Sequence, residues 1–257
     1  MVNVFDEQAG FDARFEWGIE GIRRLGPLSD VLVIVDVLSF STAVDIVVGR
    51  GACVLPYRWR DERAAGYARD ADALLAGGKR HSTAGEPYTL SPSSLLAIPS
   101  GTRLVLPSPN GSMLSQAAAE LAPVVITGCL RNARSVARAA RSIGGVVTVV
   151  AAGERWDDGE TLRPAVEDLL GAGAILSALD ADAPSPEALA AIAAFEAAAS
   201  DLDHHLRACA SGRELIERGF ERDVALASEL DGSTTVPLLH KHAFVDAGRW
   251  PSPTDYR

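Results

Sequence analysis

The sequence has few cysteines and no long apolar run, and both absences narrow the kinds of protein it can encode. Its three cysteines are odd in number, far apart and without a Cys-x-x-Cys pair. This pattern argues against a disulfide framework or a zinc ribbon and favours a reduced, cytoplasmic protein. No apolar run reaches the roughly 18 residues needed to cross a bilayer. Residues 1–6 also lack the charged and apolar regions of a signal peptide, so we expect a cytoplasmic location.

Lysine is scarce as well, since Lys79 and Lys241 are the only lysines among 24 basic residues, and 34 acidic residues bring the net charge to -10. The acidic excess is uneven. Residues 151–231 carry 18 acidic and 6 basic side chains, whereas the remaining 176 residues carry 16 and 18. A chain with this balance is poorly suited to holding nucleic acid or an anionic membrane through bulk charge.

Short β-branched runs alternate with alanine-rich helical stretches as far as residue 151, which is typical of an α/β fold. Val31–Val35 is apolar throughout, as expected of a strand that is covered on both faces. We predict one three-layer α/β/α domain, residues 1–257, with a mostly parallel sheet. Further strands are expected at Cys53–Leu55, Arg103–Leu106, Val124–Thr127 and Val146–Ala151, and helices at Ser39–Val48, Asp61–Ala76, Ser112–Leu121 and Asn132–Ser142.

Helical patterns dominate after residue 160, and residues 180–230 are predicted to form a helical appendage within the domain. The strand signals stop there, apart from one last strand at Thr234–Leu239. Gly171-Ala172-Gly173 lies inside a helical pattern rather than after a strand, so we interpret it as a site of close helix packing. The predicted helices are Val166–Leu179, Pro186–Ala199, Asp201–Ala210 and Arg213–Arg218.

Small, polar or acidic residues follow four of the predicted strands. In an open parallel sheet, ligands bind beyond the carboxyl ends of the strands. Two of these ends open helices that are rich in hydroxyl groups, and free backbone N–H groups at a helix start favour an anion. We therefore predict a pocket for an anion, or for a metal and an anion. The candidate phosphate-binding residues are Ser39, Ser41, Thr42, Ser108, Gly111, Ser112, Arg131 and Asn132.

Each of these features also has a structural interpretation. Asp36 can simply cap a helix, Asn110-Gly111 is a common turn pair, and Glu167-Asp168 fits a solvated helix face. Several familiar phosphate sites are absent. Leu38 stands where a haloacid-dehalogenase phosphatase needs its second Asp, Ser135 stands where a cysteine phosphatase needs Arg, and no P-loop occurs. The joint pattern at the strand ends is therefore the informative signal.

A series of short motifs, in order along the chain, resembles the 2-phosphosulfolactate phosphatase family. The resemblance covers residues 31–239. Its motifs are Val33–Leu38, Gly85-Glu86, Ser108–Ser112, Gly128–Ala133, Ala152-Gly153, Val166–Asp168 with Gly171–Ala174, Gly219–Val224 and Val236-Pro237.

The resemblance implies a Mg²⁺-dependent phosphatase that acts on a small acidic metabolite, and it suggests a homodimer. Asp36 and Asn110 are the candidate catalytic residues, with Asp36 acting as the nucleophile or orienting water. Mg²⁺ favours carboxylate oxygens, and the candidate metal ligands are Asp36, Glu86, Glu167 and Asp168.

Two positions depart from the family pattern. Ser39 and Met113 stand where the family commonly has arginine. Each lost bidentate contact to an anion is worth roughly 1.5–3 kcal/mol. The departures favour two alternatives: a catalytically silent homologue that binds an anionic metabolite or a partner, and a homologue recruited to a different reaction.

Overall fold

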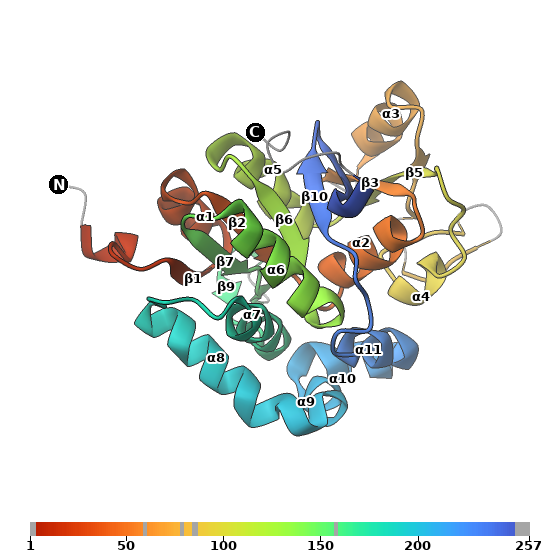
Figure 1. The fold of residues 1–257 in the computed structure, drawn as a ribbon. Helices are drawn as coiled ribbons and strands as arrows, with labels where there is room; N and C mark the ends of the chain where they lie inside the picture. Colours follow the sequence, from red (N-terminus) through yellow and green to blue (C-terminus); the bar gives the residue numbers. More distant parts are fainter. Residues whose placement is uncertain (1–3, 59–60, 78–79, 84–86, 157–158, 250–257) are drawn as a thin grey trace.

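The computed structural model describes residues 4–58, 61–77, 80–83, 87–156 and 159–249. Within these residues nine strands form one sheet, in the order β1-β7-β2-β6-β10-β11-β3-β5-β4 (Figure 1). The strands are β1 (Ala13–Trp17), β2 (Val31–Val35), β3 (Cys53–Tyr57), β4 (Leu74–Leu75), β5 (Arg103–Pro107), β6 (Val125–Gly128), β7 (Val147–Ala151), β10 (Pro237–His240) and β11 (Ala243–Asp246). A separate antiparallel pair joins β8 (Glu154–Arg155) to β9 (Leu162–Arg163).

The sheet is mostly parallel, as predicted, but it is divided into two parallel groups. One group is β1-β7-β2-β6 and the other is β3-β5-β4. The β10–β11 hairpin lies between them and pairs antiparallel with β6 on one side and with β3 on the other. The carboxyl ends of β2 and β5 therefore do not belong to the edge of one uninterrupted parallel sheet.

Helices cover both faces of the sheet and complete the three predicted layers (Figure 1). Val31, Val33 and Val35 of β2 pack with α6 and α7, whereas the alternate residues Leu32 and Ile34 pack with α1 and α5. The helices are α1 (Gly18–Leu25), α2 (Phe40–Gly49), α3 (Glu62–Asp70), α4 (Pro92–Leu95), α5 (Gly111–Leu121), α6 (Ala133–Ile143), α7 (Val166–Leu179), α8 (Pro186–Ala198), α9 (Leu202–Ala208), α10 (Ala210–Glu217) and α11 (Glu221–Ser228). Short 3₁₀ turns are η1 (Val4–Glu7), η2 (Gly26–Leu28), η3 (Leu130–Asn132), η4 (Ala199–Asp201) and η5 (Ala247–Arg249).

One prediction about the elements was wrong, and several strands were missed. The helix expected at Asp61–Ala76 ends at Asp70, because Asp72 adopts a left-handed backbone and the next residues pair with β5 as β4. The strand expected at Thr234–Leu239 is confirmed as β10, but β9 and β11, which also follow residue 160, were not predicted. Sequence reasoning also missed β1, which lies at the edge of the sheet next to β7.

The helices α8–α11 pack together with α7 on the lower side of the molecule in Figure 1. The glycines inside α7 allow this close approach, as predicted. A Cβ on Gly173 would lie 2.1 Å from the carbonyl oxygen of Ala191 in α8, and one on Gly171 would lie 2.6 Å from the side chain of Val37. Phe195, Leu206 and other residues of these helices share one hydrophobic cluster with β2 and α6.

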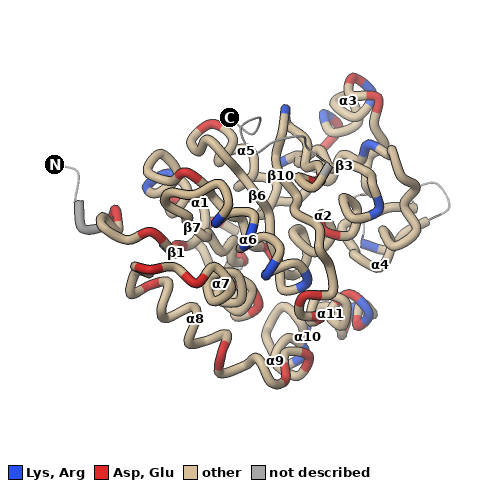
Figure 2. Tube along the Cα trace, in the orientation of Figure 1, with Lys and Arg blue, Asp and Glu red and all other residues tan. Residues whose placement is uncertain are grey.

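Acidic residues recur along α8, α9 and α11, and most of them are exposed (Figure 2). The exceptions in residues 151–231 include Glu167, Asp168 and Asp223, whose residues are at most 3% exposed. The first two were singled out by sequence, and Asp223 was not. No helix in the described parts of the chain combines the length and the apolar character needed to cross a membrane.

Candidate active site

A polar cleft of about 250 Å³ lies where the ends of β2, β5 and β7 approach helix α10. Three of the four predicted strand ends contribute to it, and the end of β6 does not. The lining residues are Asp36, Leu38, Ser39, Arg80, Leu90, Ser108, Pro109, Asn110, Glu154, Ser211, Glu214, Leu215 and Arg218.

Asp36 directly follows β2 and is fixed by the first backbone groups of two helices. Its Oδ1 accepts a hydrogen bond from the Phe40 N–H of α2 (3.1 Å), and its Oδ2 accepts one from the Gly111 N–H of α5 (2.9 Å). Gly111 is required here, because a Cβ at this position would lie 2.2 Å from the Phe40 ring. Burial raises the pKa of Asp36 to about 6, against the effect of these two hydrogen bonds.

Asp168, in the first turn of α7, joins the ends of β2 and β7. Its Oδ1 accepts a hydrogen bond from the Val37 N–H (2.7 Å), and its Oδ2 accepts one from the Gly153 N–H (2.9 Å). Burial, and next the charge of Asp36, raise the pKa of Asp168 well above its ordinary value. Glu167 beside it is 2% exposed and contributes to the raised pKa of both Asp36 and Asp168.

Glu154 follows β7 and faces Asn110 across the cleft. The Asn110 amide donates a hydrogen bond from Nδ2 to Glu154 Oε2 (2.9 Å). Burial, followed by the charges of Asp36 and Glu167, raises the pKa of Glu154 to about 7. The pair also borders an apolar recess of about 110 Å³, so that one ligand can reach both spaces. The other lining residues of the recess are Trp17, Gly18, Ile19, Glu20, Met113, Leu114, Ala152, Arg155, Glu160 and Leu162.

A guanidinium enters the cleft from residue 80, which sequence reasoning did not single out. The Arg80 Nη2 donates a hydrogen bond to the Ser39 hydroxyl, and its Nε lies 3.5 Å from Asp223 Oδ2. The Arg80 Cζ is 5.3 Å from the centre of the Phe220 ring. Burial outweighs the effect of Arg80, which nevertheless lowers the pKa of Asp36.

Several predicted phosphate-binding side chains make structural hydrogen bonds instead of lining the cleft. The Ser41 hydroxyl binds Thr127, the Thr42 hydroxyl donates to the Val37 carbonyl, and the Ser112 hydroxyl donates to the Leu106 carbonyl. Ser41, Thr42 and Ser112 are all fully buried. Ser39 and Ser108 do line the cleft.

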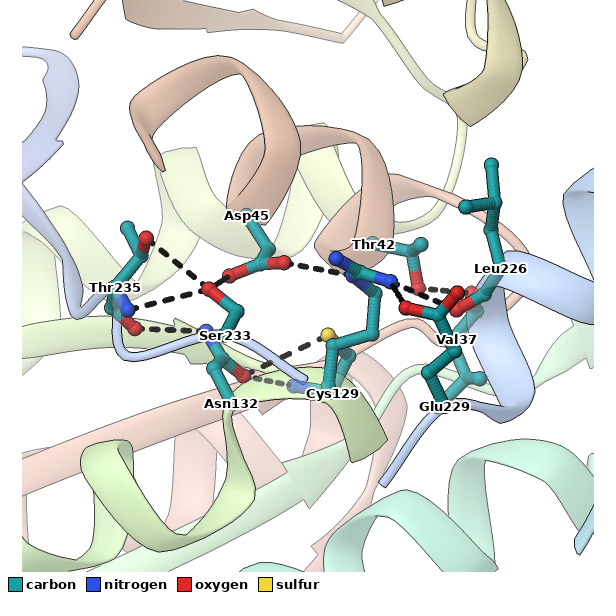
Figure 3. Close-up of polar contacts among 10 residues, drawn as sticks. Val37, Thr42, Asp45, Cys129, Asn132, Leu226, Glu229, Ser233 and Thr235 are labelled. Carbon is teal, nitrogen blue, oxygen red and sulfur yellow. Dashed lines mark hydrogen bonds and ion pairs between the residues drawn. The ribbon is translucent and has the colours of Figure 1, made fainter. Parts of the chain in front are cut away.

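Arg131 and Asn132, after β6, belong to a separate buried network (Figure 3). The Arg131 Nε donates to Asp45 Oδ2 (3.0 Å), while Asp45 Oδ1 accepts from the Ser233 hydroxyl (2.6 Å). Asn132 donates from Nδ2 to the Thr235 carbonyl (3.1 Å). These contacts fasten α2 to η3 and to the segment before β10, and neither residue lines the cleft.

The donor chemistry of the cleft fits Mg²⁺. Hard carboxylate oxygens of Asp36 and Glu154 line it; burial and, after it, the charges of neighbouring carboxylates raise the pKa values of these two groups, and a cation would offset that charge. Among the described residues, no three His, Cys, Asp or Glu side chains are arranged to hold a metal ion together. Mg²⁺ commonly takes only one or two carboxylates together with water and phosphate. Glu86, the remaining predicted ligand, lies outside the described residues.

Known proteins resemble this chain over most of its length. The profile of the family described as 2-phosphosulpholactate phosphatase matches residues 21–242. The chain belongs to this family. The resemblance read from the ordered motifs is thereby confirmed.

Individual members of the 2-phosphosulfolactate phosphatase family match the chain across bacteria and archaea. A probable 2-phosphosulfolactate phosphatase of Thermus thermophilus is 30% identical over 220 residues, covering 82% of this chain and 88% of that protein. The probable enzyme of Deinococcus radiodurans is 27% identical, covering 85% and 91%. The 2-phosphosulfolactate phosphatase of Methanothermobacter thermautotrophicus is 29% identical, covering 82% and 87%.

Proposed function

We propose that this chain is a Mg²⁺-dependent phosphatase that hydrolyses a phosphomonoester of a small acidic metabolite. The observation that carries the proposal is Asp36, whose two oxygens are fixed by the helix starts of α2 and α5 at the base of a polar cleft. Family membership supports the reaction type. The names of the relatives make 2-phosphosulfolactate the first compound to test.

In this proposal Asp36 holds the metal and either attacks the phosphorus or orients the attacking water. Bound Mg²⁺ would offset the negative charge on the phosphoryl oxygens. Glu154, held by the Asn110 amide, is placed to donate a proton to the leaving oxygen. Ester and water then yield the alcohol and inorganic phosphate. Glu167 and Asp168 are proposed to support the metal site through their charge and through the bonds that join β2 to β7.

The test is phosphate release from 2-phosphosulfolactate and other phosphorylated 2-hydroxy acids, with Mg²⁺ and with EDTA. We expect turnover in Mg²⁺ only, and a loss of at least about 100-fold in Asp36→Asn. Glu196→Gln, an exposed acid on α8, is the control and should behave as the wild type. Turnover that Asp36→Asn leaves unchanged would contradict the assignment.

Binding of an anionic metabolite without turnover is the second candidate function. It is favoured by Ser39 and Met113, which stand where the family commonly has arginine. Thermal stabilisation by phosphorylated acids, with no phosphate released from any of them in Mg²⁺, would identify the protein as such a binder.

A further inference from the structure

Two other parts of the chain hold the Arg80 side chain where it lines the cleft. Besides the Ser39 hydroxyl, it contacts two residues near the start of α11, with Asp223 beside its Nε and the Phe220 ring beneath its guanidinium. The Arg80 carbonyl also accepts a hydrogen bond from the Thr89 hydroxyl (2.8 Å). The side chain is only 20% exposed. Its position is therefore set before any ligand binds.

Asp223 is itself fixed in the interior. Its side chain is fully buried, and its Oδ1 accepts hydrogen bonds from the Ser91 hydroxyl (2.8 Å) and from the Ser93 N–H (2.9 Å). The other oxygen faces Arg80. A buried carboxylate held in this way leaves the neighbouring guanidinium little freedom to turn away, so less entropy is lost when it binds a ligand.

The charges around the cleft identify what Arg80 can bind. The carboxylates of Asp36, Glu154 and Glu214 line the cleft. Arg218, the other lining arginine, is largely exposed and forms an ion pair with Glu214 at 2.7 Å. Arg80 is the more buried of the two lining arginines. An anion that enters among these carboxylates gains most from a planar, already oriented donor.

We propose that Arg80 binds the phosphoryl group of the ligand and that Asp223 is the residue that positions it. The ligand class rests on the proposed function, but phosphate binding can be measured without turnover. The competing explanation is that the Arg80–Asp223 pair only fastens the segment around residue 80 to α11. In that case its loss would lower stability and leave phosphate affinity unchanged.

The experiment is calorimetric titration of the full-length protein with inorganic phosphate in the presence of Mg²⁺, below the unfolding temperature of each variant. Arg80→Met should weaken phosphate binding roughly 10- to 100-fold, which is the loss expected for a charged hydrogen bond. Arg80→Lys keeps the charge without the planar fork and should fall between Arg80→Met and the wild type. Arg213→Met, an exposed change of equal charge on α10, should bind as the wild type does.

A double-mutant cycle tests the positioning role. Asp223→Asn should weaken phosphate binding in the wild-type background and change it little in Arg80→Met, because it acts through the guanidinium. Additive effects of the two substitutions would overturn the positioning role.

Wild-type affinity in Arg80→Met, or in Arg80→Lys if the first variant does not fold, would overturn the proposal. Absence of phosphate binding by the wild type would also overturn it. If the wild type binds phosphate through Arg80 but hydrolyses none of the esters, the proposed function fails and this inference stands.

Discussion

The buried acids of the cleft should make the stability of the metal-free protein fall as the pH rises. Burial raises the pKa of Asp36 from 3.8 to about 6, and burial with the charges of Asp36 and Glu167 raises that of Glu154 from 4.5 to about 7. At a pH between the ordinary and the raised pKa of each group, the carboxyl is protonated in the folded chain and ionised in the unfolded chain. The contribution of these two groups to the stability of the folded chain is therefore fully present below about pH 4 and is lost by about pH 7.

The magnitude follows from the pKa change. A rise from 3.8 to about 6 corresponds to about 3 kcal/mol in the free energy of unfolding, and Glu154 contributes a similar amount. Urea unfolding in EDTA, followed by tryptophan fluorescence, should show this decrease between about pH 4 and pH 8. Dilute protein is needed, because the isoelectric point of about 5.0 lies within that range.

Asp36→Asn isolates the contribution of Asp36. Over the same pH range, the total decrease in its free energy of unfolding should be about 3 kcal/mol smaller than the decrease in the wild type. Parallel curves for the two proteins would refute the reasoning. Mg²⁺ should reduce the decrease in the wild type, because a cation binds only the ionised carboxylates. Identical curves with Mg²⁺ and with EDTA would contradict the metal site while leaving the burial argument intact.

Three further predictions concern the surroundings of the cleft. Asp168→Ala leaves the Val37 and Gly153 N–H groups without their acceptor and should lower the unfolding free energy by about 2–4 kcal/mol, measured by urea unfolding. Gly111→Ala meets the Phe40 ring and should cost about 2 kcal/mol or more in the same assay, whereas Gly66→Ala, in the open interior of α3, should stabilise by about 0.5–1 kcal/mol; a neutral Gly111→Ala would contradict the close approach. Arg131→Met removes a partner of the buried Asp45 and should lower the free energy of unfolding by about 3 kcal/mol. Phosphate binding in calorimetry should be unchanged, and a weakened affinity would indicate that Arg131 belongs to the binding site.

The strand ends could be predicted from the sequence because local patterns mark them. The apolar run of β2, the Asp that follows it and the hydroxyl-rich helix start predicted a pocket at the end of β2; Asp36 and Ser39 line a cleft there, and its role as a binding site stays a prediction. The assumption behind this reasoning, a single parallel edge, does not hold between β2 and β5. Asp36 joins their ends, because it accepts hydrogen bonds from the first N–H groups of α2 (Phe40) and of α5 (Gly111).

The structural role of Arg131 could not be predicted from the residues next to it in the sequence. It follows a strand and begins a helical segment, as the residues around Asp36 do. Its place is decided by Asp45 and Ser233, which are distant in sequence and show no periodic pattern that links them to it. Glu154 comes shortly after the strand predicted at Val146–Ala151, but its pairing with Asn110 joins residues 44 positions apart and has no local signal in the sequence.

Arg80 was missed for the same physical reason. It stands between β4 and α4 in a stretch without helical or strand periodicity, and its partner Asp223 comes from the opposite end of the chain. The absence of arginine at positions 39 and 113 suggested a weakened anion site. The structure places a guanidinium against Ser39 from another part of the chain.

The contact between Arg80 and α11 bears on the order in which the cleft is completed during synthesis. Asp36, Asn110 and Glu154 all leave the ribosome before α10 and α11, and domains assemble as the chain emerges from its N-terminus. A chain interrupted after α8 would contain the acids at the base but would lack one wall and the carboxylate that holds Arg80. Such a chain would also lack the β10–β11 hairpin that joins the two parallel groups of strands, so the cleft can be completed only after the last strands of the sheet have been synthesised.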